Sequence, residues 1–130
     1  MATNAAKTVI YVEDEPAVRR LVAFWLEDAG FVVHLAADGA AGMELIRSRH
    51  PDLVVTDALM PVLTGDELVE QLKDDPQLRH IPIIMATAAA SPLRVRKMLA
   101  LGCASVIAKP MDEDSFLAAV RSALDGVDQS

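Results

Sequence analysis

Short apolar runs alternate along the chain with longer stretches in which apolar residues recur every three or four positions. Runs of four or five residues rich in Val, Ile and Leu are typical of β-strands, and uninterrupted ones are typical of strands covered on both faces of a parallel sheet. The longer stretches have the period of helices that bury one face. The pattern predicts five strands, over residues 8–12, 31–35, 53–56, 83–87 and 104–108.

Capping residues and helix breakers predict where the helices between these strands begin and end. The first helix begins near Glu15-Pro16, because proline tolerates an early helical position, and it stops at Gly30. The third begins at Thr64, which has capping-box spacing with Glu67. The other predicted helices cover roughly 39–48, run from Ser91-Pro92 to Gly102, and follow the capping carboxylate of Asp112.

Apolar spacing also predicts which helical side chains face the core. Trp25 lies on such a stripe, so we expect it to pack in the interior rather than bind a ligand. The residues expected to face inward are Val18, Leu21, Val22, Trp25 and Ala29 in the first helix, Val95, Met98 and Leu99 in the fourth, and Phe116, Val120 and Leu124 in the fifth.

Strict alternation of strand and helix with short connections predicts an α/β fold, a doubly wound five-stranded parallel sheet with right-handed crossovers. A chain of 130 residues is expected to form a single domain. We expect residues 1–6 and 126–130 to be flexible tails.

Composition narrows the possible functions. The net charge of −7 argues against a nucleic-acid surface, which needs clustered Lys and Arg. Cys103 is the sole cysteine, which excludes an internal disulfide and suits a reducing compartment. No basic, apolar leader opens the chain, and no uncharged stretch approaches the roughly 20 residues needed to span a bilayer. A soluble, cytoplasmic protein is therefore expected.

Polar residues stand at the carboxyl ends of four predicted strands. Glu13 and Asp14 follow the first strand, Asp57 follows the third, Thr87 ends the fourth and Lys109 follows the fifth. Doubly wound sheets bind ligands at this edge, where the strand order reverses. We therefore expect these side chains to converge on one site.

An acidic pocket without His or Cys suits Mg²⁺, with Mn²⁺ as a possible substitute. We expect Asp14 and Asp57 to bind the ion directly, Glu13 to act through a water molecule and the backbone carbonyl of Leu59 to supply a further oxygen. A carboxylate beside such an ion can attack phosphorus and become an aspartyl phosphate, with Lys109 as a second positive contact. A Thr87 hydroxyl that reaches the phosphoryl group only when it is present would make a switch.

Each of these residues has a plainer interpretation when it is taken singly. Asp14 could favour the positive end of the first helix, Thr87 could be an ordinary strand residue, and Lys109 could be a solvated surface charge. Their joint placement at four strand ends favours a functional site.

Four segments resemble the receiver domain of two-component response regulators, and the resemblance covers nearly the whole chain. They are Val-Glu-Asp-Glu at 12–15, Asp-Ala-Leu-Met-Pro-Val-Leu-Thr-Gly at 57–65, Ile-Pro-Ile-Ile-Met-Ala-Thr-Ala at 81–88 and Lys-Pro at 109–110. The resemblance implies a flavodoxin-like (βα)5 fold with strand order 2-1-3-4-5.

The resemblance also implies roles for individual residues. Asp57 corresponds to the phosphoacceptor, and Glu13 and Asp14 correspond to the acidic pair that holds the metal. The phosphate-binding and switch positions are Thr87, Ala88, Lys109 and Pro110, with a cis peptide bond before Pro110.

A receiver is a signalling module rather than an enzyme in the ordinary sense, and it takes its phosphoryl group from a sensor histidine kinase or a histidine phosphotransfer protein. The resemblance places a downstream partner on the face formed by helix four, strand five and helix five, and implies a monomer or a weak phosphorylation-dependent dimer. The docking residues expected there are Arg94, Arg96, Lys97, Met98 and Arg121. We expect a stand-alone receiver, with a phosphorelay intermediate or a fragment of a larger regulator or hybrid kinase as alternatives.

Val106 departs from the family pattern, because the position three before the lysine usually carries Tyr or Phe. The coupling in which a threonine moves and an aromatic ring turns inward cannot operate with valine. Output is then expected to pass through the loop after Thr87 and the fourth helix, or to be weaker.

Three other functions compete with this interpretation. A haloacid-dehalogenase-type phosphohydrolase needs a second Asp two residues after its nucleophile, where this chain has Leu59. A flavin- or nucleotide-binding module needs a phosphate loop after the first strand, where Glu13 and Asp14 would repel phosphate. A phosphorylation-independent interaction domain on the same fold draws its main support from Val106.

Overall fold

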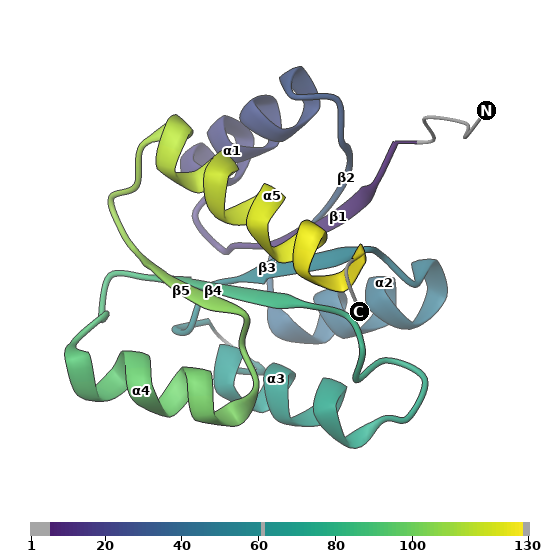
Figure 1. Ribbon diagram of the computed structural model, residues 1–130, viewed down its shortest axis with the longest axis vertical. Coiled ribbons are helices and arrows are strands. Elements are labelled where there is room, and N and C mark those ends of the chain that lie inside the picture. The colour runs from purple at the N-terminus through teal and green to yellow at the C-terminus, as the bar shows by residue number, and fades with distance from the viewer. Residues whose placement is uncertain (1–5, 61, 129–130) are drawn as a thin grey trace.

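The computed structural model describes residues 6–60 and 62–128, over which strands and helices alternate strictly (Figure 1). The order is β1 (Thr8–Val12), α1 (Pro16–Asp28), β2 (Val32–Ala36), α2 (Gly39–Arg49), β3 (Leu53–Thr56), α3 (Gly65–Asp74), β4 (Ile83–Thr87), α4 (Pro92–Leu101), β5 (Ser105–Ala108) and α5 (Glu113–Asp128).

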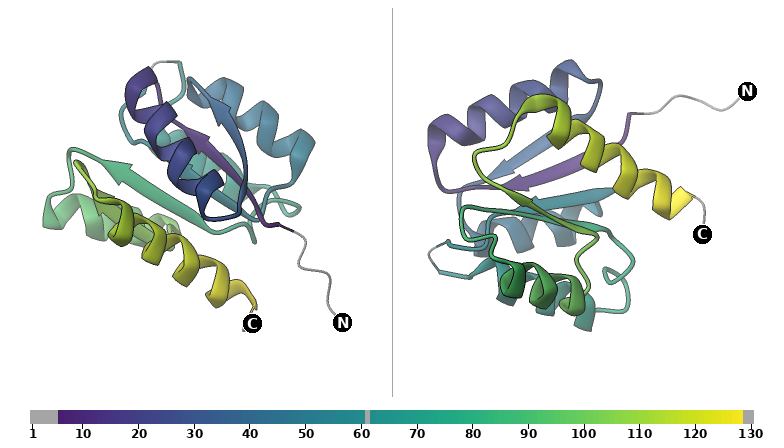
Figure 2. Two further views of the ribbon diagram at one scale, coloured as in Figure 1. Left: turned by 90° about the horizontal axis from the view of Figure 1, so that it is seen from above. Right: turned by 60° about the vertical axis from the view of Figure 1, so that its left-hand side comes forward.

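The strands form one parallel sheet in the order β2-β1-β3-β4-β5, which confirms the predicted fold and strand order. Helices α1 and α5 cover one face, and α2, α3 and α4 cover the other (Figures 1 and 2). The chain leaves β1 toward β2 on one side and returns to β3 on the other. The strand order therefore reverses between the carboxyl ends of β1 and β3, where sheets of this kind bind ligands.

Two apolar clusters, one on each face of the sheet, hold these layers together. Alternate residues of each strand point to opposite faces, so Ile10 and Val54 belong to the cluster under α2, α3 and α4, whereas Val9 and Val55 belong to the cluster under α1 and α5. All four side chains are fully buried. The central strands are covered on both sides, as their uninterrupted apolar runs predicted.

Helix ends follow the predicted caps. The Thr64 hydroxyl accepts a hydrogen bond from the Glu67 N–H, and the Glu67 carboxylate accepts one from the Thr64 N–H, which completes a capping box. The Ser91 hydroxyl and the Asp112 carboxylate accept hydrogen bonds from backbone N–H groups at the starts of α4 and α5. Strand β2 lies one residue later than predicted, and β5 begins at Ser105.

Two inward-facing predictions were wrong. The side chains of Leu21 and Leu99 are 51% and 45% exposed, whereas Leu26, outside the predicted stripe, is fully buried. Neighbouring positions on a helix point about 100° apart, so the sheet covers Val22 and Leu26 and leaves Leu21 outside. Trp25 packs as expected, with its ring 6.0 Å from that of Phe116.

The predicted tails need one correction. Helix α5 continues to Asp128, so residues 126–128 are helical rather than part of a tail. Residues 1–5 and 129–130 lie outside the described residues. Within the part of the chain that is described, no helix combines the length and apolar character needed to cross a membrane.

Candidate functional site at the carboxyl ends of the strands

Backbone hydrogen bonds place two carboxylates side by side at the strand-order reversal. The Asp57 N–H donates to the carbonyl of Val12 over 3.2 Å, which extends the pairing of β3 with β1 by one residue. The Glu13 N–H donates to the carbonyl of Ala36 over 3.0 Å and extends the pairing of β1 with β2. The ladder that builds the sheet therefore also sets the spacing of the site.

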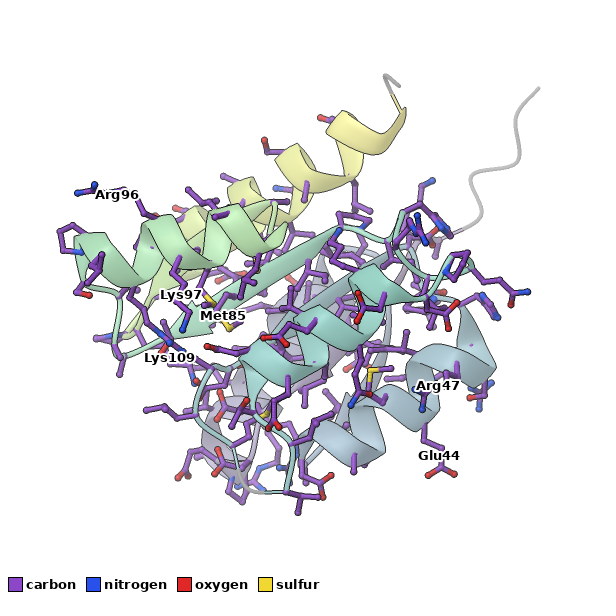
Figure 3. All side chains as sticks on the ribbon, turned by 90° about the horizontal axis from the view of Figure 1, so that it is seen from below. Glu44, Arg47, Met85, Arg96, Lys97 and Lys109 are labelled. Carbon is purple, nitrogen blue, oxygen red and sulfur yellow. The ribbon has the colours of Figure 1, made fainter. Side chains whose placement is uncertain are left out.

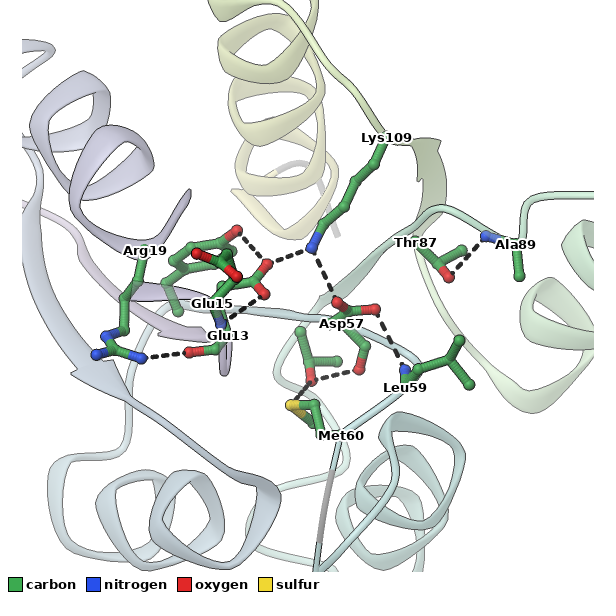
Figure 4. Close-up of polar contacts among 11 residues, drawn as sticks. Glu13, Glu15, Arg19, Asp57, Leu59, Met60, Thr87, Ala89 and Lys109 are labelled. Carbon is green, nitrogen blue, oxygen red and sulfur yellow. Dashed lines mark hydrogen bonds and ion pairs between the residues drawn. The ribbon is translucent and has the colours of Figure 1, made fainter. Parts of the chain in front are cut away.

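Lys109 bridges these carboxylates from the end of β5 (Figure 4). Its Nζ lies 2.8 Å from Oδ2 of Asp57 and also donates to Oε1 of Glu13. Burial by itself lowers the pKa of the Lys109 ammonium, but the hydrogen bonds to Asp57 and Glu13 outweigh it and raise that pKa above its usual value. Lys109 therefore carries its positive charge into the acidic pocket.

Glu13 is the most firmly held residue of the site. Its side chain is 1% exposed. Oε1 accepts from the Tyr11 hydroxyl over 3.1 Å, and Oε2 accepts from the Glu15 N–H over 3.1 Å. The Arg19 guanidinium donates to the Glu13 carbonyl over 2.8 Å. Burial, followed by the charge of Glu13, raises the pKa of Tyr11, so its hydroxyl keeps its proton and acts as a donor.

Three carboxylates meet here in a way that suits a divalent cation. Glu13, Asp14 and Asp57 each offer an oxygen, and these oxygens lie within 4.8 Å of one another. Asp14 is exposed, and its side chain forms no hydrogen bond with any residue that the structure describes. An all-oxygen donor set with one open carboxylate matches the preference of Mg²⁺ for a few carboxylates and several waters. The residues present therefore fit the expected metal.

The loop after β3 curls around Asp57. The N–H of Leu59 donates to Oδ1 of Asp57 over 3.2 Å, while the Leu59 side chain is 64% exposed. At the other end of the loop, the Gly65 N–H donates to the Ala58 carbonyl over 3.0 Å. A Cβ atom on Gly65 would lie 2.3 Å from the Asp57 carbonyl oxygen, so only glycine permits this approach.

Thr87 lies at the same edge of the sheet, but among the described residues its side chain forms no hydrogen bond with Asp57. Thr87 is fully buried, and its hydroxyl accepts a hydrogen bond from the Ala89 N–H over 3.1 Å. Ala88, between them, is exposed. The Lys109 N–H donates to the Thr87 carbonyl over 3.0 Å, and the bond between Lys109 and Pro110 is cis, as the resemblance implied.

Val106 lies opposite Met85 in the pairing of β5 with β4 and packs, partly buried, against the cluster under α2, α3 and α4. A valine in this position fills the strand surface without the reach of an aromatic ring. The loss of aromatic coupling therefore stays a prediction from the sequence.

Sequence reasoning missed the roles of Tyr11, Arg19 and Gly65. Tyr11 and Glu13 are two residues apart, and this spacing places both on the same face of an extended chain, a signal that was available in the sequence. Gly65 stood in the recognised motif without a stated role. Arg19 gave no signal, because its partner is a backbone carbonyl.

Comparison with known proteins identifies one family. A family model described as the response regulator receiver domain matches residues 9–121. The polar-differentiation response regulator DivK of Brucella abortus is 34% identical over 118 residues, which cover 91% of this chain and 96% of DivK. The hybrid signal transduction histidine kinase D of Dictyostelium discoideum is 42% identical over 112 residues, which cover 86% of this chain but only 7% of that kinase.

Solved structures of receiver domains are also similar to this chain. The chemotaxis response regulator CheY4 of Vibrio cholerae has a TM-score of 0.86 and 29% identity, with 92% of this chain and 99% of that chain covered. A CheY-like receiver domain protein of Methanospirillum hungatei has a TM-score of 0.89 and 26% identity, with 96% and 98% covered.

Proposed function

This chain belongs to the response regulator receiver domain family of two-component signalling, and from that premise we propose that Asp57 is its phosphoacceptor. A receiver of this family is a signalling module rather than a classical enzyme, and its family implies a histidine kinase as partner. One observation carries the residue assignment: Oδ2 of Asp57 lies 2.8 Å from Lys109, within a pocket shared with the carboxylates of Glu13 and Asp14.

The transfer needs a nucleophilic carboxylate and positive charge around the phosphoryl group. A carboxylate oxygen of Asp57 forms a bond to phosphorus as the bond from phosphorus to the donor's imidazole nitrogen breaks, and that nitrogen keeps the electron pair. The Leu59 N–H and the Lys109 ammonium orient the two oxygens of Asp57 beforehand.

Four groups would hold the metal: Asp14 and Asp57 directly, Glu13 through a water molecule, and Leu59 through its carbonyl. Mg²⁺, or Mn²⁺ in its place, would neutralise charge on the carboxylates and the phosphoryl oxygens. The water-mediated role of Glu13 is supported by its hydrogen bonds, because both of its oxygens already accept donors from the protein.

The switch would begin when Lys109 and Thr87 turn to the phosphoryl oxygens. Thr87 would exchange its contact with the Ala89 N–H for donation to the phosphoryl group, which changes the loop that leads into α4. Ala88 and Pro110 would border the same site, because each directly follows one of the phosphate-binding residues, Thr87 and Lys109. With Val106 in place of an aromatic residue, this loop and α4 would carry the output.

Two kinds of protein partner follow from the proposed function, a phosphodonor and a downstream partner. The phosphodonor would be a sensor histidine kinase or a histidine phosphotransfer protein, and the chain would act as a single domain, monomeric or weakly dimeric after phosphorylation. The downstream partner would dock on α4, β5 and α5. Arg96, Lys97 and Arg121 are exposed there, and Arg96 extends away from the body of the protein in Figure 3. Met98 is fully buried, which removes it from the predicted docking residues.

Incubation with Mg²⁺ and acetyl phosphate, followed by intact-mass measurement, tests the acceptor assignment. We expect wild type to gain one phosphoryl group and Asp57→Asn to gain none, with EDTA abolishing the gain. Asp52→Asn is the matched control, because Asp52 is an exposed aspartate that directly precedes β3, whereas Asp57 directly follows it. Labelling of Asp57→Asn at the wild-type level, or wild-type labelling that survives EDTA, would refute the assignment.

A further inference from the structure

Tyr11 is the single tyrosine of the chain, and it lies fully buried in the apolar cluster under α1 and α5. A phenol in such a place needs a hydrogen-bond partner for its hydroxyl. The partner is Oε1 of Glu13, 3.1 Å away. The Tyr11 hydroxyl thus reaches the acidic pocket from the apolar cluster under α1 and α5.

The same Glu13 oxygen is shared with Lys109, which also binds Asp57. The side chains of these two donors, Tyr11 and Lys109, differ in conformational freedom. Lys109 is a flexible four-carbon chain that ends in a point charge, whereas the Tyr11 ring is fixed by close packing on all sides. Among the described residues, Tyr11 and Lys109 are the two side chains that donate to the Glu13 carboxylate.

We propose that Tyr11 is a positioning residue whose hydroxyl keeps the Glu13 carboxylate in place for the metal, both beside Lys109 in the unphosphorylated protein and after Lys109 turns to the phosphoryl group. This inference rests on the proposed function. Without Tyr11, departure of Lys109 would leave Glu13 with only the Glu15 N–H, and a buried carboxylate with one donor reorients. Glu13 would orient a metal-bound water, and the loss of hydrogen bonds around the direct ligands of a metal commonly costs ten-fold or more in metal affinity.

Tyr11→Phe removes the hydroxyl and keeps the ring that fills the core. We expect the dissociation constant for Mg²⁺, measured by isothermal titration calorimetry on the unphosphorylated protein, to rise about ten-fold. Val9→Ala is the matched control, because Val9 is fully buried in the same cluster and on the same strand but carries no polar group. Its Mg²⁺ affinity is expected to stay within about two-fold of wild type.

A double-mutant cycle with Glu13→Gln separates positioning from general damage. If Tyr11 acts through Glu13, adding Tyr11→Phe to Glu13→Gln changes the Mg²⁺ affinity by less than about two-fold. An unchanged affinity in Tyr11→Phe, an equal loss in Val9→Ala, or a full ten-fold loss in the Glu13→Gln background would each overturn the inference. Wild type that neither binds Mg²⁺ nor is labelled would overturn the proposed function as well. Wild type that is labelled while Tyr11→Phe binds Mg²⁺ normally would overturn the inference alone.

Discussion

Gly65 shows how a single residue without a functional group can control a functional site. Its Cα faces the backbone of Asp57 so closely that any Cβ would collide with the Asp57 carbonyl oxygen. The collision is with backbone, which cannot swing aside as a flexible side chain would. The position of Asp57, the proposed acceptor, therefore depends on the absence of a side chain at the start of α3.

Gly65→Ala is expected to lower the free energy of unfolding by roughly 1–3 kcal/mol and to slow phosphorylation from acetyl phosphate, because Asp57 must shift. Urea unfolding and the initial labelling rate measure the two effects. Gly126→Ala is the control, because nothing lies within 4 Å of a Cβ there and the residue is helical. That variant should gain about 0.5–1 kcal/mol. Equal behaviour of the two variants would contradict the close-approach argument.

Cys103 is a buried thiol whose reactivity the structure limits. Burial raises the pKa of Cys103 to about 11, with the charge of Lys73 acting weakly in the opposite direction. The reactive thiolate is therefore scarce at neutral pH. We expect slow reaction with a chromogenic disulfide reagent in the native protein and rapid reaction after denaturation in urea. Equally fast labelling of the native protein would show that the thiol is accessible.

At the scale of elements, the capping box of α3 links stability to acid pH. Donation from the Thr64 N–H and hydroxyl to the Glu67 carboxylate holds the pKa of Glu67 below its usual value. A carboxyl whose pKa is lower in the folded protein contributes stability above its unfolded pKa, and this is lost as the pH falls through the folded value. Asp112 behaves in the same way because the Ser115 N–H donates to it.

Urea unfolding between pH 6 and pH 3 tests this linkage, over a range that spans the usual pKa of Glu at about 4.3 and extends below it. Glu67→Gln should flatten the loss of stability on acidification, because the group that titrates is gone. Glu70→Gln is a suitable control, since Glu70 is an exposed residue of the same helix outside the capping box. An identical acid response of wild type and Glu67→Gln would contradict the assignment.

A second element-scale contact joins the starts of α3 and α4. The Arg94 guanidinium donates to both oxygens of Asp66, over 2.7 and 3.1 Å, and the two side chains are 24% and 20% exposed. Asp66 directly follows Gly65, so this ion pair connects the loop around Asp57 with α4. It joins α3, the helix that follows the proposed acceptor, to the helix proposed to carry the output.

Arg94→Ala is expected to lower the free energy of unfolding by about 1 kcal/mol and to speed amide hydrogen exchange in the first turns of α4, because a bidentate ion pair is lost. Arg94→Lys should recover little of this, since an ammonium cannot form both bonds. Arg96→Ala serves as the control, because Arg96 is exposed on the same helix. Unchanged exchange in Arg94→Ala would show that the pair does not restrain α4.

For the molecule as a whole, we expect the acidic pocket to couple folding to divalent ions. A ligand that binds only the folded chain stabilises it by about 2.7 kcal/mol at one hundred times its dissociation constant. We expect the melting temperature to rise with Mg²⁺ and to fall back with EDTA. Asp14→Asn should be more stable than wild type in EDTA, since one like charge is gone, and should respond less to Mg²⁺. A wild-type Mg²⁺ response in Asp14→Asn would exclude it as a direct ligand.

Local sequence patterns were enough to predict the elements, their alternation and the polar residues at the strand ends. Apolar periodicity, prolines, glycines and capping residues act within a few positions of one another, so local spacing was enough to assign Thr64 and Asp112 as caps. The motif that contains Asp57 was recognisable for the same reason, because the polar residues of the site lie at or directly after the ends of their strands.

Contacts between distant groups, and the choice of covered helix faces, became clear from the three-dimensional structure alone. Lys109 reaches Glu13 across 96 positions and Arg94 reaches Asp66 across 28, and no local pattern encodes such pairings. Leu21 is exposed although its spacing fits an apolar stripe, because tertiary packing decides which face of α1 lies against the sheet. Local rules set what each segment becomes, whereas packing in three dimensions sets the neighbours that give Asp57 its surroundings.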